Sequence, residues 1–259
     1  MPNIEKPNQQ FEKRNQTYKI IDAILQQPEL KEAMEKGNFI WQNKFHEFDV
    51  YDHSADYLKH ILDLTTDPDI IAAAYLHDIG KPMVAKPKKD KKTGKAIYKD
   101  ANNKTPYHDF TDHEKIGAQY VRDLDPKIFN NINKLLSNSN IRLDKEKIAQ
   151  LINCHYLPMK GIKSLREIIK NNGKFEEWQK RFQELTESLD KPEEAPDISK
   201  EEILTMFLAD KLAQGPNLPD KNELLAIREI MANENFSIED LKMIYQIQQE
   251  NFKNKVYDY

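Results

Sequence analysis

Residues 70–82 read IIAAAYLHDIGKP, an apolar run that ends on an adjacent histidine and aspartate. A segment that is apolar on every side is typical of a helix buried at the centre of a domain. The Gly-Lys-Pro sequence that follows supplies stop signals, so we expect a central helix over residues 69–79. Such a helix would end by presenting His77 and Asp78 side by side, where a ligand could reach both.

The composition favours an all-α protein. Charged residues make up 32% of the 259 residues and hydrophobic residues 39%, with only 7 glycines, which suits helices better than a turn-rich β fold. A chain of this length can bury about 70% of its unfolded surface, enough for one large domain with an appendage. The single cysteine, Cys154, excludes an intramolecular disulfide and a cysteine-rich zinc site. A metal would therefore be held by histidines and carboxylates.

Charge and hydropathy constrain the location and the partners. The formal net charge of -4 argues against a protein that coats nucleic acid over a whole face, although a local basic patch could still bind phosphates. No apolar run approaches the roughly 20 residues of a membrane span, and the N-terminus lacks the apolar stretch of a signal peptide. We therefore expect a cytoplasmic protein without a membrane partner. The sequence leaves the oligomeric state open.

The sequence predicts three parts: an N-terminal tail and helix over residues 1–39, a main domain over residues 40–215, and a helical appendage over residues 216–259. A basic flap over residues 83–107 interrupts the main domain. Seven lysines and one aspartate lie between positions 81 and 95, and turn-forming residues near Thr93 and Gly94 indicate a short β-hairpin. The flap is either a solvated loop or a surface that attracts phosphates.

Residues 45–64 predict an amphipathic helix with an unusual polar face. In chain order that face carries His46, Asp49, His53, Asp56 and His60, whereas a solvated face usually holds lysine and glutamate. Asp49 lies one turn before His53, so it would orient that imidazole, bind a metal directly, or remain a surface carboxylate. His46 and His60 lie seven residues from His53, about 10 Å along a helix, so we leave both out of a shared site.

Similar side chains recur on later helices. Capping boxes at residues 111–114 and 199–202 predict the starts of two helices, the first with His113 in its opening turn and the second carrying Asp210. A third predicted helix ends near His155. In one sequence a lone histidine on a helix is more often structural, so the residue types alone leave a metal site open. The candidates in chain order are His53, His77, Asp78, His113, His155 and Asp210.

The local sequence around these candidates resembles the HD superfamily of metal-dependent phosphohydrolases. The segments HEFDVYDHS, AYLHDIGKP, TDHEKIGAQ, LINCH and LADKLAQG match its motifs in order, over about residues 40–215. The HDIGK string with the upstream DVxxH is the most specific part. The likeness is closest to the HD domain of bacterial CCA-adding tRNA nucleotidyltransferases, and we expect a stand-alone domain without the nucleotidyltransferase head.

The resemblance implies an HD-domain helical bundle with a metal centre. It assigns His53, His77, Asp78 and Asp210 to one divalent ion, and in two-metal members Asp78 bridges to a second ion held by His113 and His155. Mixed imidazole and carboxylate donors suit manganese, iron, nickel, cobalt or zinc better than magnesium, whose preferred shell is all oxygen. Neither the identity of the metal nor the choice between one and two ions follows from the sequence.

The resemblance also assigns roles in substrate binding. Lys81 matches the HDxxK position of the family and is expected to hold a phosphate oxygen, so it joins Asp78 as a candidate catalytic residue. His108, at the end of the flap, is a further candidate for contact with the substrate phosphate, with a surface role as the alternative.

The expected reaction is hydrolysis of a phosphomonoester or phosphodiester of a nucleotide or an RNA end by a metal-activated water. A 2',3'-cyclic phosphodiesterase and a nucleotidase are both candidates. Two other functions stay open: an HD-type diiron oxygenase, which uses the same six residue types, and a non-catalytic nucleotide-binding module.

Overall fold

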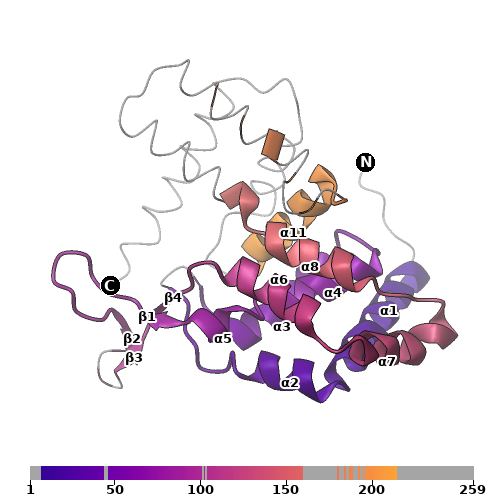
Figure 1. Ribbon diagram of the computed structural model, residues 1–259, viewed down its shortest axis with the longest axis horizontal. Coiled ribbons are helices and arrows are strands. Elements are labelled where there is room, and N and C mark those ends of the chain that lie inside the picture. The colour runs from indigo at the N-terminus through magenta and orange to yellow at the C-terminus, as the bar shows by residue number, and fades with distance from the viewer. Residues whose placement is uncertain are drawn as a thin grey trace.

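The computed structural model describes residues 7–43, 46–100, 102, 104–159 and 197–214, with isolated residues between 180 and 195 (Figure 1). The appendage expected over residues 216–259 lies outside the described residues. In the part that is described, helices dominate and the strands are short, which confirms the all-α prediction. No helix in these ranges combines the length and the apolarity needed to cross a bilayer.

The helices divide into those before and those after the flap. Before it come α1 (Pro7–Leu25), α2 (Pro28–Glu35), α3 (Val50–Ile61), α4 (Pro68–Leu76) and α5 (Lys81–Val84). After it come α6 (His113–Asp123), α7 (Pro126–Leu136), the 3-10 helix η1 (Ser137–Ser139), α8 (Lys145–Cys154) and α11 (Lys200–Leu212). The flap holds β1 (Lys86–Pro87), β2 (Tyr98–Asp100), β3 (Thr105–Pro106) and β4 (His108–Asp109).

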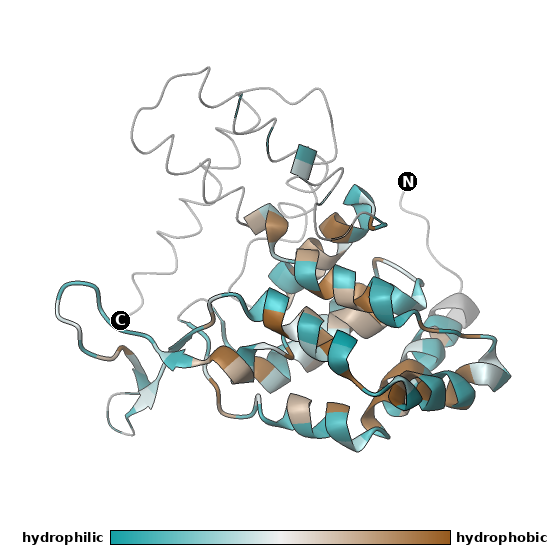
Figure 2. Ribbon diagram, viewed as in Figure 1, coloured by the Kyte–Doolittle hydropathy of each residue, from teal (hydrophilic) through white to brown (hydrophobic). Residues whose placement is uncertain are grey.

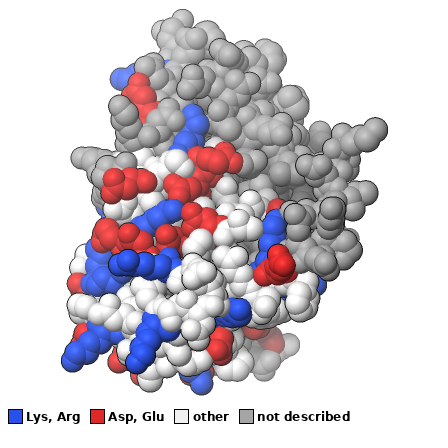
Figure 3. Space-filling view, turned by 90° about the vertical axis from the view of Figure 1, so that its right-hand side faces the viewer, with Lys and Arg blue, Asp and Glu red and all other residues white. Residues whose placement is uncertain are grey.

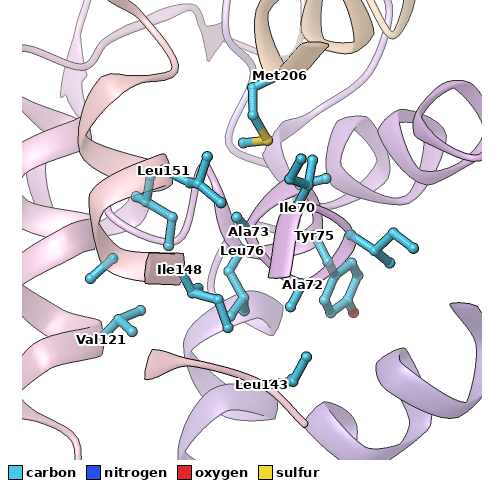
Figure 4. Packing of buried hydrophobic residues seen from close by; sticks show 14 of the residues in the cluster. Ile70, Ala72, Ala73, Tyr75, Leu76, Val121, Leu143, Ile148, Leu151 and Met206 are labelled. Atoms are coloured by element: carbon cyan, nitrogen blue, oxygen red, sulfur yellow. The ribbon is translucent and has the colours of Figure 1, made fainter. Parts of the chain in front are cut away.

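Helix α4 lies at the centre of the bundle, as the sequence predicts. It packs against α1, α3, α8 and α11, and every residue from Ile70 to Leu76 is buried. Figure 4 shows Ala73 and Leu76 of α4 close to Ile148 and Leu151 of α8. Alanines on α4 let the neighbouring helices approach its axis closely, because the separation of packed helices depends on the side chains at their contact. The C-terminal end of α4 is therefore fixed inside the bundle.

The ends of α4 follow from local sequence. The Asp67 carboxylate accepts hydrogen bonds from the backbone N–H groups of Asp69 and Ile70, and Pro68 occupies the first turn. The helix ends at Leu76, three residues earlier than expected, and residues 77–80 form a turn. His77 and Asp78 therefore lie in the turn between α4 and α5, which aims both side chains into the bundle.

Gly80 brings this turn into direct contact with α6. A Cβ at Gly80 would lie 2.2 Å from the carbonyl oxygen of His113 and 2.6 Å from the backbone nitrogen of Gly117. Both neighbours are backbone atoms, which cannot rotate away as a side chain could. The missing side chain of Gly80 therefore permits the approach that brings the His77–Asp78 turn next to His113.

Helix α3 differs from the sequence prediction in its start and in the arrangement of its polar face. It begins at Val50 rather than near residue 45, because Asp49 is its N-cap and accepts a hydrogen bond from the Asp52 N–H. The buried face consists of Val50, His53, Ser54, Tyr57 and Ile61. The predicted polar face therefore does not act as a unit: His53 points inward, whereas His60 pairs with Asp56 at 3.4 Å.

The two predicted capping boxes had different outcomes. The box at residues 199–202 is confirmed: the Ser199 hydroxyl accepts from the Glu202 N–H, and the Glu202 carboxylate accepts from the Ser199 N–H. The box at residues 111–114 is wrong. Helix α6 begins at His113, and Asp112 precedes it in the left-handed region, with φ of 61°, without a side-chain cap.

The flap spans residues 86–109 rather than the predicted 83–107, because α5 extends to Val84 and β4 ends at Asp109, and it is built from two small antiparallel sheets. Strand β1 pairs with β4 at the base, and β2 pairs with β3. Beyond them a bridge between Lys89 and Ala96 closes a turn in which Gly94 has φ of +68°. The hairpin predicted around Thr93 and Gly94 is therefore confirmed. The flap extends away from the helical bundle (Figure 1) and is mostly hydrophilic (Figure 2).

An ion-pair cluster joins the first turns of α4, α8 and α11. The Lys147 ammonium lies 2.9 Å from Asp67 Oδ2, 2.9 Å from Glu202 Oε1 and 3.9 Å from Asp69 Oδ2. The other oxygen of Asp69 accepts a hydrogen bond from the Asp144 N–H. Burial, reinforced by the like charge of Asp67, raises the pKa of Asp69 from 3.8 to about 6.

We predict that Gly80→Ala lowers the free energy of unfolding by about 3 kcal/mol, because the added methyl group overlaps the backbone of α6. Urea denaturation followed by circular dichroism measures the change. Gly94→Ala is the matched control: its Cβ would meet open space, and only its positive φ would cost about 1 kcal/mol. Equal losses in the two variants would contradict the close-packing role of Gly80.

We also predict a pH-dependent effect of Asp69→Asn. The pKa of Asp69 is raised on folding, so its contribution to stability is present at low pH and is lost as the pH rises to about 6. The asparagine variant keeps an acceptor for Asp144, so it should gain stability over wild type by about 1 kcal/mol between pH 4 and pH 7, after allowance for solvent screening. Urea denaturation at both pH values measures this. Parallel pH profiles would contradict it.

Candidate metal centre

Five elements deliver the six predicted side chains to one place. His53 comes from α3, His77 and Asp78 from the turn after α4, and the remaining three from the start of α6, the end of α8 and the last turns of α11. All six residues are buried, with His53, His77 and Asp78 completely inaccessible to solvent. The structure therefore brings together every residue of the predicted set: His53, His77, Asp78, His113, His155 and Asp210.

One group of donors surrounds His53 and His77. His53 Nε2 lies 3.1 Å from Asp210 Oδ1 and 3.7 Å from Asp78 Oδ2. His77 Nε2 lies 3.1 Å from the same Asp78 oxygen and 3.9 Å from Asp210 Oδ1. Ligand atoms of His53, His77 and Asp210 all lie within 4.8 Å of one another, a spacing that could hold one metal ion.

A second group shares residues with the first. Ligand atoms of His77, Asp78 and His155 also lie within 4.8 Å of one another. His113 belongs to neither three-residue group, but its Nε2 lies 3.5 Å from Asp78 Oδ1, the oxygen that faces away from the first group. Asp78 therefore has one oxygen towards His53 and His77 and the other towards His113, which is the arrangement that a bridging carboxylate requires.

The four imidazoles are oriented by the backbone in the same way. In each ring Nδ1 lies against a backbone carbonyl oxygen: Ala213 for His53 at 2.9 Å, Ala74 for His77 at 2.9 Å, Phe110 for His113 at 2.9 Å and Ile152 for His155 at 2.6 Å. A carbonyl can only accept, so each Nδ1 carries the proton and donates it. Each Nε2 is then left with a free lone pair. Histidines that bind metals through Nε2 are commonly fixed in this manner.

Two buried atoms at the centre of the cluster lack hydrogen bonds among the described residues. They are Nε2 of His77 and Oδ1 of Asp78. Leaving a buried polar atom unpaired costs about 1–3 kcal/mol, so such atoms usually indicate a missing partner. A cation would satisfy both atoms at once. The donor set therefore fits a divalent metal ion.

The carboxylates of the cluster are held in their charged form. Burial alone would raise the pKa of Asp78, but its electrostatic interactions with His77 and Lys81 outweigh burial and hold the pKa well below the usual range. Burial opposes the charged form of Asp210 in the same way, and Lys211 and the hydrogen bond from His53 hold its pKa well below the usual range. Both carboxylates are thus in the state that binds a metal.

Two of the four imidazoles, those of His113 and His155, have a lowered pKa, which favours their neutral form. Burial, followed by electrostatic interactions with the neighbouring His77 and His113, lowers the pKa of His155 to about 3. Burial and the charge of Lys81 also lower the pKa of His113. A histidine binds a metal only through an unprotonated nitrogen, so these environments favour metal binding at neutral pH.

A cavity of about 630 Å³ opens above the cluster. Of the six predicted residues, His113, His155 and Asp210 reach its wall, so the completely buried donors lie beneath it. Lys81 and His108 also line the cavity, and their contact with a substrate phosphate stays a prediction. The Lys81 ammonium lies 2.5 Å from Asp78 Oδ2 and 2.5 Å from Gln42 Oε1, and His108 Nδ1 lies 3.0 Å from the Trp41 carbonyl oxygen.

Asp49 does not orient His53, contrary to one of the roles considered. Its carboxylate accepts from the N–H groups of Asp52 and Phe39, at 2.9 and 2.7 Å, and so caps α3 and holds the preceding loop. The partner of His53 Nδ1 is instead the carbonyl oxygen of Ala213, 160 positions away. A backbone partner that distant has no signal in the local sequence.

Sequence reasoning missed three residues that line the cavity. His46 was placed on the same helix as His53, but it precedes α3, and its ring centroid lies 5.3 Å from that of His53. Recognising Asp49 as an N-cap would have shown that the chain can turn back there. Gln42 binds Lys81, and the Lys211 ammonium lies 2.8 Å from Asp210 Oδ2. Neither residue has a sequence signal beyond its proximity to a motif.

The fold and the donor set define a helical domain of the metal-binding class. The protein-family model described as the HD domain matches residues 50–215, more than half of the chain. The chain therefore belongs to the HD domain family, whose members are generally metal-dependent hydrolases. No curated protein and no solved structure matches it. The likeness to the CCA-adding enzymes and the roles of individual residues remain predictions.

We predict that His53→Gln weakens the binding of Mn²⁺ or Co²⁺ by about 100-fold or more. The substitution removes a ligand of the metal, and even the loss of a residue that only orients a ligand weakens metal binding by about 10–100-fold. Isothermal titration calorimetry of chelator-treated protein measures the affinity. His60→Gln is the matched control, since His60 lies on the same helix and pairs with Asp56 outside the cluster. Equal affinities of the two variants would contradict the assignment of the centre.

Proposed function

We propose that the protein is a divalent-metal-dependent phosphohydrolase that acts on phosphomonoesters or phosphodiesters of nucleotides or RNA ends. The observation that carries the proposal is the buried cluster beneath the cavity, in which oriented imidazoles and charged carboxylates leave His77 Nε2 and Asp78 Oδ1 without partners. When bound there, a divalent metal supplies Lewis acidity that activates water and stabilises the charge on a phosphoryl group.

The proposed ligands fall into two sets that share Asp78. His53, His77, Asp78 and Asp210 would hold a first ion, and Asp78, His113 and His155 a second. The separate orientation of the two Asp78 oxygens supports this sharing, since one faces His53 and His77 and the other faces His113. One or two equivalents of manganese, iron, nickel, cobalt, zinc or magnesium would satisfy the proposal.

The groups around the cavity support a phosphate-bearing substrate. Lys81, Lys88 and Lys211 line it together with His46 and His108, and four acidic residues also reach its wall. Lys81 is proposed to exchange part of its contact with Asp78 for a phosphate oxygen, which holds the phosphoryl group above the cluster. The volume of about 630 Å³ lies within the range of sites that bind small ligands and accommodates one nucleotide.

We predict that Asp78→Asn lowers phosphoester hydrolysis by about 100-fold or more, because the amide removes a charged oxygen donor from the centre. The assay measures metal content by elemental analysis and then phosphate or alcohol release from p-nitrophenyl phosphate, bis-p-nitrophenyl phosphate and a 2',3'-cyclic nucleotide. Mn²⁺, Co²⁺, Ni²⁺, Fe²⁺ and Mg²⁺ are compared. Asp123→Asn, an exposed aspartate at the end of α6, is the matched control.

Two results would contradict the proposal. Two equivalents of iron with oxygen uptake and no hydrolysis would assign the centre to an oxygenase. A protein that binds nucleotides, but binds no metal and hydrolyses none of these esters, would be a binding module.

A further inference from the structure

The flap carries a strong positive charge in a protein whose net charge is negative. Eight lysines and three aspartates lie within residues 86–109. Seven of the lysines are exposed: Lys86, Lys89, Lys91, Lys92, Lys95, Lys99 and Lys104. In contrast to the flap, the face of the molecule shown in Figure 3 carries lysines and arginines interspersed with acidic residues.

Most of the flap lysines have no carboxylate partner. Within the described part of the chain, Lys88 pairs with Asp109 at 3.4 Å, but no ion pair involves the exposed lysines at 86, 89, 91, 92, 95 and 104. The Asp90 carboxylate lies among them but accepts hydrogen bonds from Lys92 N, Thr93 N and the Thr93 hydroxyl, which fix the turn. The exposed ammonium groups are therefore available to an external anion.

The backbone of the flap is ordered by hydrogen bonds, which distinguishes it from a solvated loop. The Ile97 N–H donates to the Lys88 carbonyl, and the Tyr107 N–H donates to the Ile97 carbonyl. Three segments of the flap are therefore hydrogen-bonded side by side. Two contacts attach the flap to the loop before α3: the His108 N–H donates to the Trp41 carbonyl at 2.9 Å, and the Lys99 ammonium lies 2.9 Å from the centroid of the Trp41 ring. A backbone held in this way loses less conformational entropy on binding than the backbone of a mobile loop would.

The positive charge leads directly to the candidate active site. Lys88 lines the cavity, and Lys89, Lys91 and Lys92 follow it along the chain towards the turn. Exposed Tyr98 lies on the same flap and offers an aromatic face. A positively charged track with an aromatic side chain is the combination that binds single-stranded nucleic acids, since phosphates contact lysines and bases stack on rings.

We propose that the flap binds a single-stranded polynucleotide whose terminal phosphate enters the cavity. The inference rests on the proposed function for the reaction at that terminus, whereas binding by the flap does not depend on it. It narrows the substrate from nucleotides in general to the end of a longer strand. The cavity accommodates the terminal nucleotide, and the preceding nucleotides run along the lysines towards the turn.

The test is binding of fluorescent 12-nucleotide RNA and DNA single strands that carry a 3'-phosphate, measured by anisotropy at several salt concentrations. The variant replaces Lys89, Lys91, Lys92 and Lys95 with glutamine. We expect the affinity at 50 mM salt to fall by at least tenfold and the slope of log affinity against log salt to decrease by about 2–3, because each phosphate contact on a single strand contributes about 0.7. A preference between RNA and DNA would identify which strand the flap binds.

The matched control replaces four exposed lysines outside the flap, Lys19, Lys31, Lys127 and Lys134, with glutamine. It removes the same charge, so an equal loss of affinity would reduce the effect to net charge and overturn the proposal. Unchanged affinity in the flap variant would also overturn it, as would flap-dependent binding to phosphatidylserine vesicles without oligonucleotide binding. The binding assay is repeated with Asp78→Asn, whose retained affinity would separate a failure of catalysis from a failure of the flap.

Discussion

The buried carboxylate of Asp78 is the contact on which the arrangement of the protein depends. Its Oδ2 lies 2.5 Å from the Lys81 ammonium and 3.1 Å from His77 Nε2, and its Oδ1 lies 3.5 Å from His113 Nε2. A carboxylate is costly to bury unless a cation pairs with it, and here the Lys81 ammonium does so. The fold places Asp78 directly after the apolar run that ends α4 at Leu76, and the missing side chain of Gly80 lets the next turn lie against α6.

The candidate metal centre is buried, whereas the lysines of the flap are exposed. In the centre, burial lowers the pKa of His113 and His155, whereas neighbouring groups outweigh burial and keep the carboxylates of Asp78 and Asp210 charged. The flap instead presents its ammonium groups to solvent, where they can attract an anion over a Debye length of about 8–10 Å. The two meet at the cavity wall, which Lys88 of the flap and His113 of α6 share.

The sequence predicted the features that depend on local pattern or on ordered motifs. The central position of the helix after residue 68, the hairpin near Gly94 and the six converging residues all follow from it. The sequence did not predict features whose cause lies far away along the chain or depends on the backbone conformation of one residue. The start of α3 depends on the cap by Asp49, the left-handed Asp112 precludes the expected capping box, and the partner of His53 is a carbonyl from the other end of the domain.

A crystal structure of protein loaded with Mn²⁺ or Co²⁺, with anomalous data collected on both sides of the metal absorption edge, tests the central claim most directly. We predict an anomalous peak bound by Nε2 of His53 and His77 and by oxygens of Asp78 and Asp210. A second ion, if it binds, lies beside Asp78 Oδ1, His113 and His155. Metal bound only elsewhere, or a centre that stays empty at saturating metal, would contradict the account.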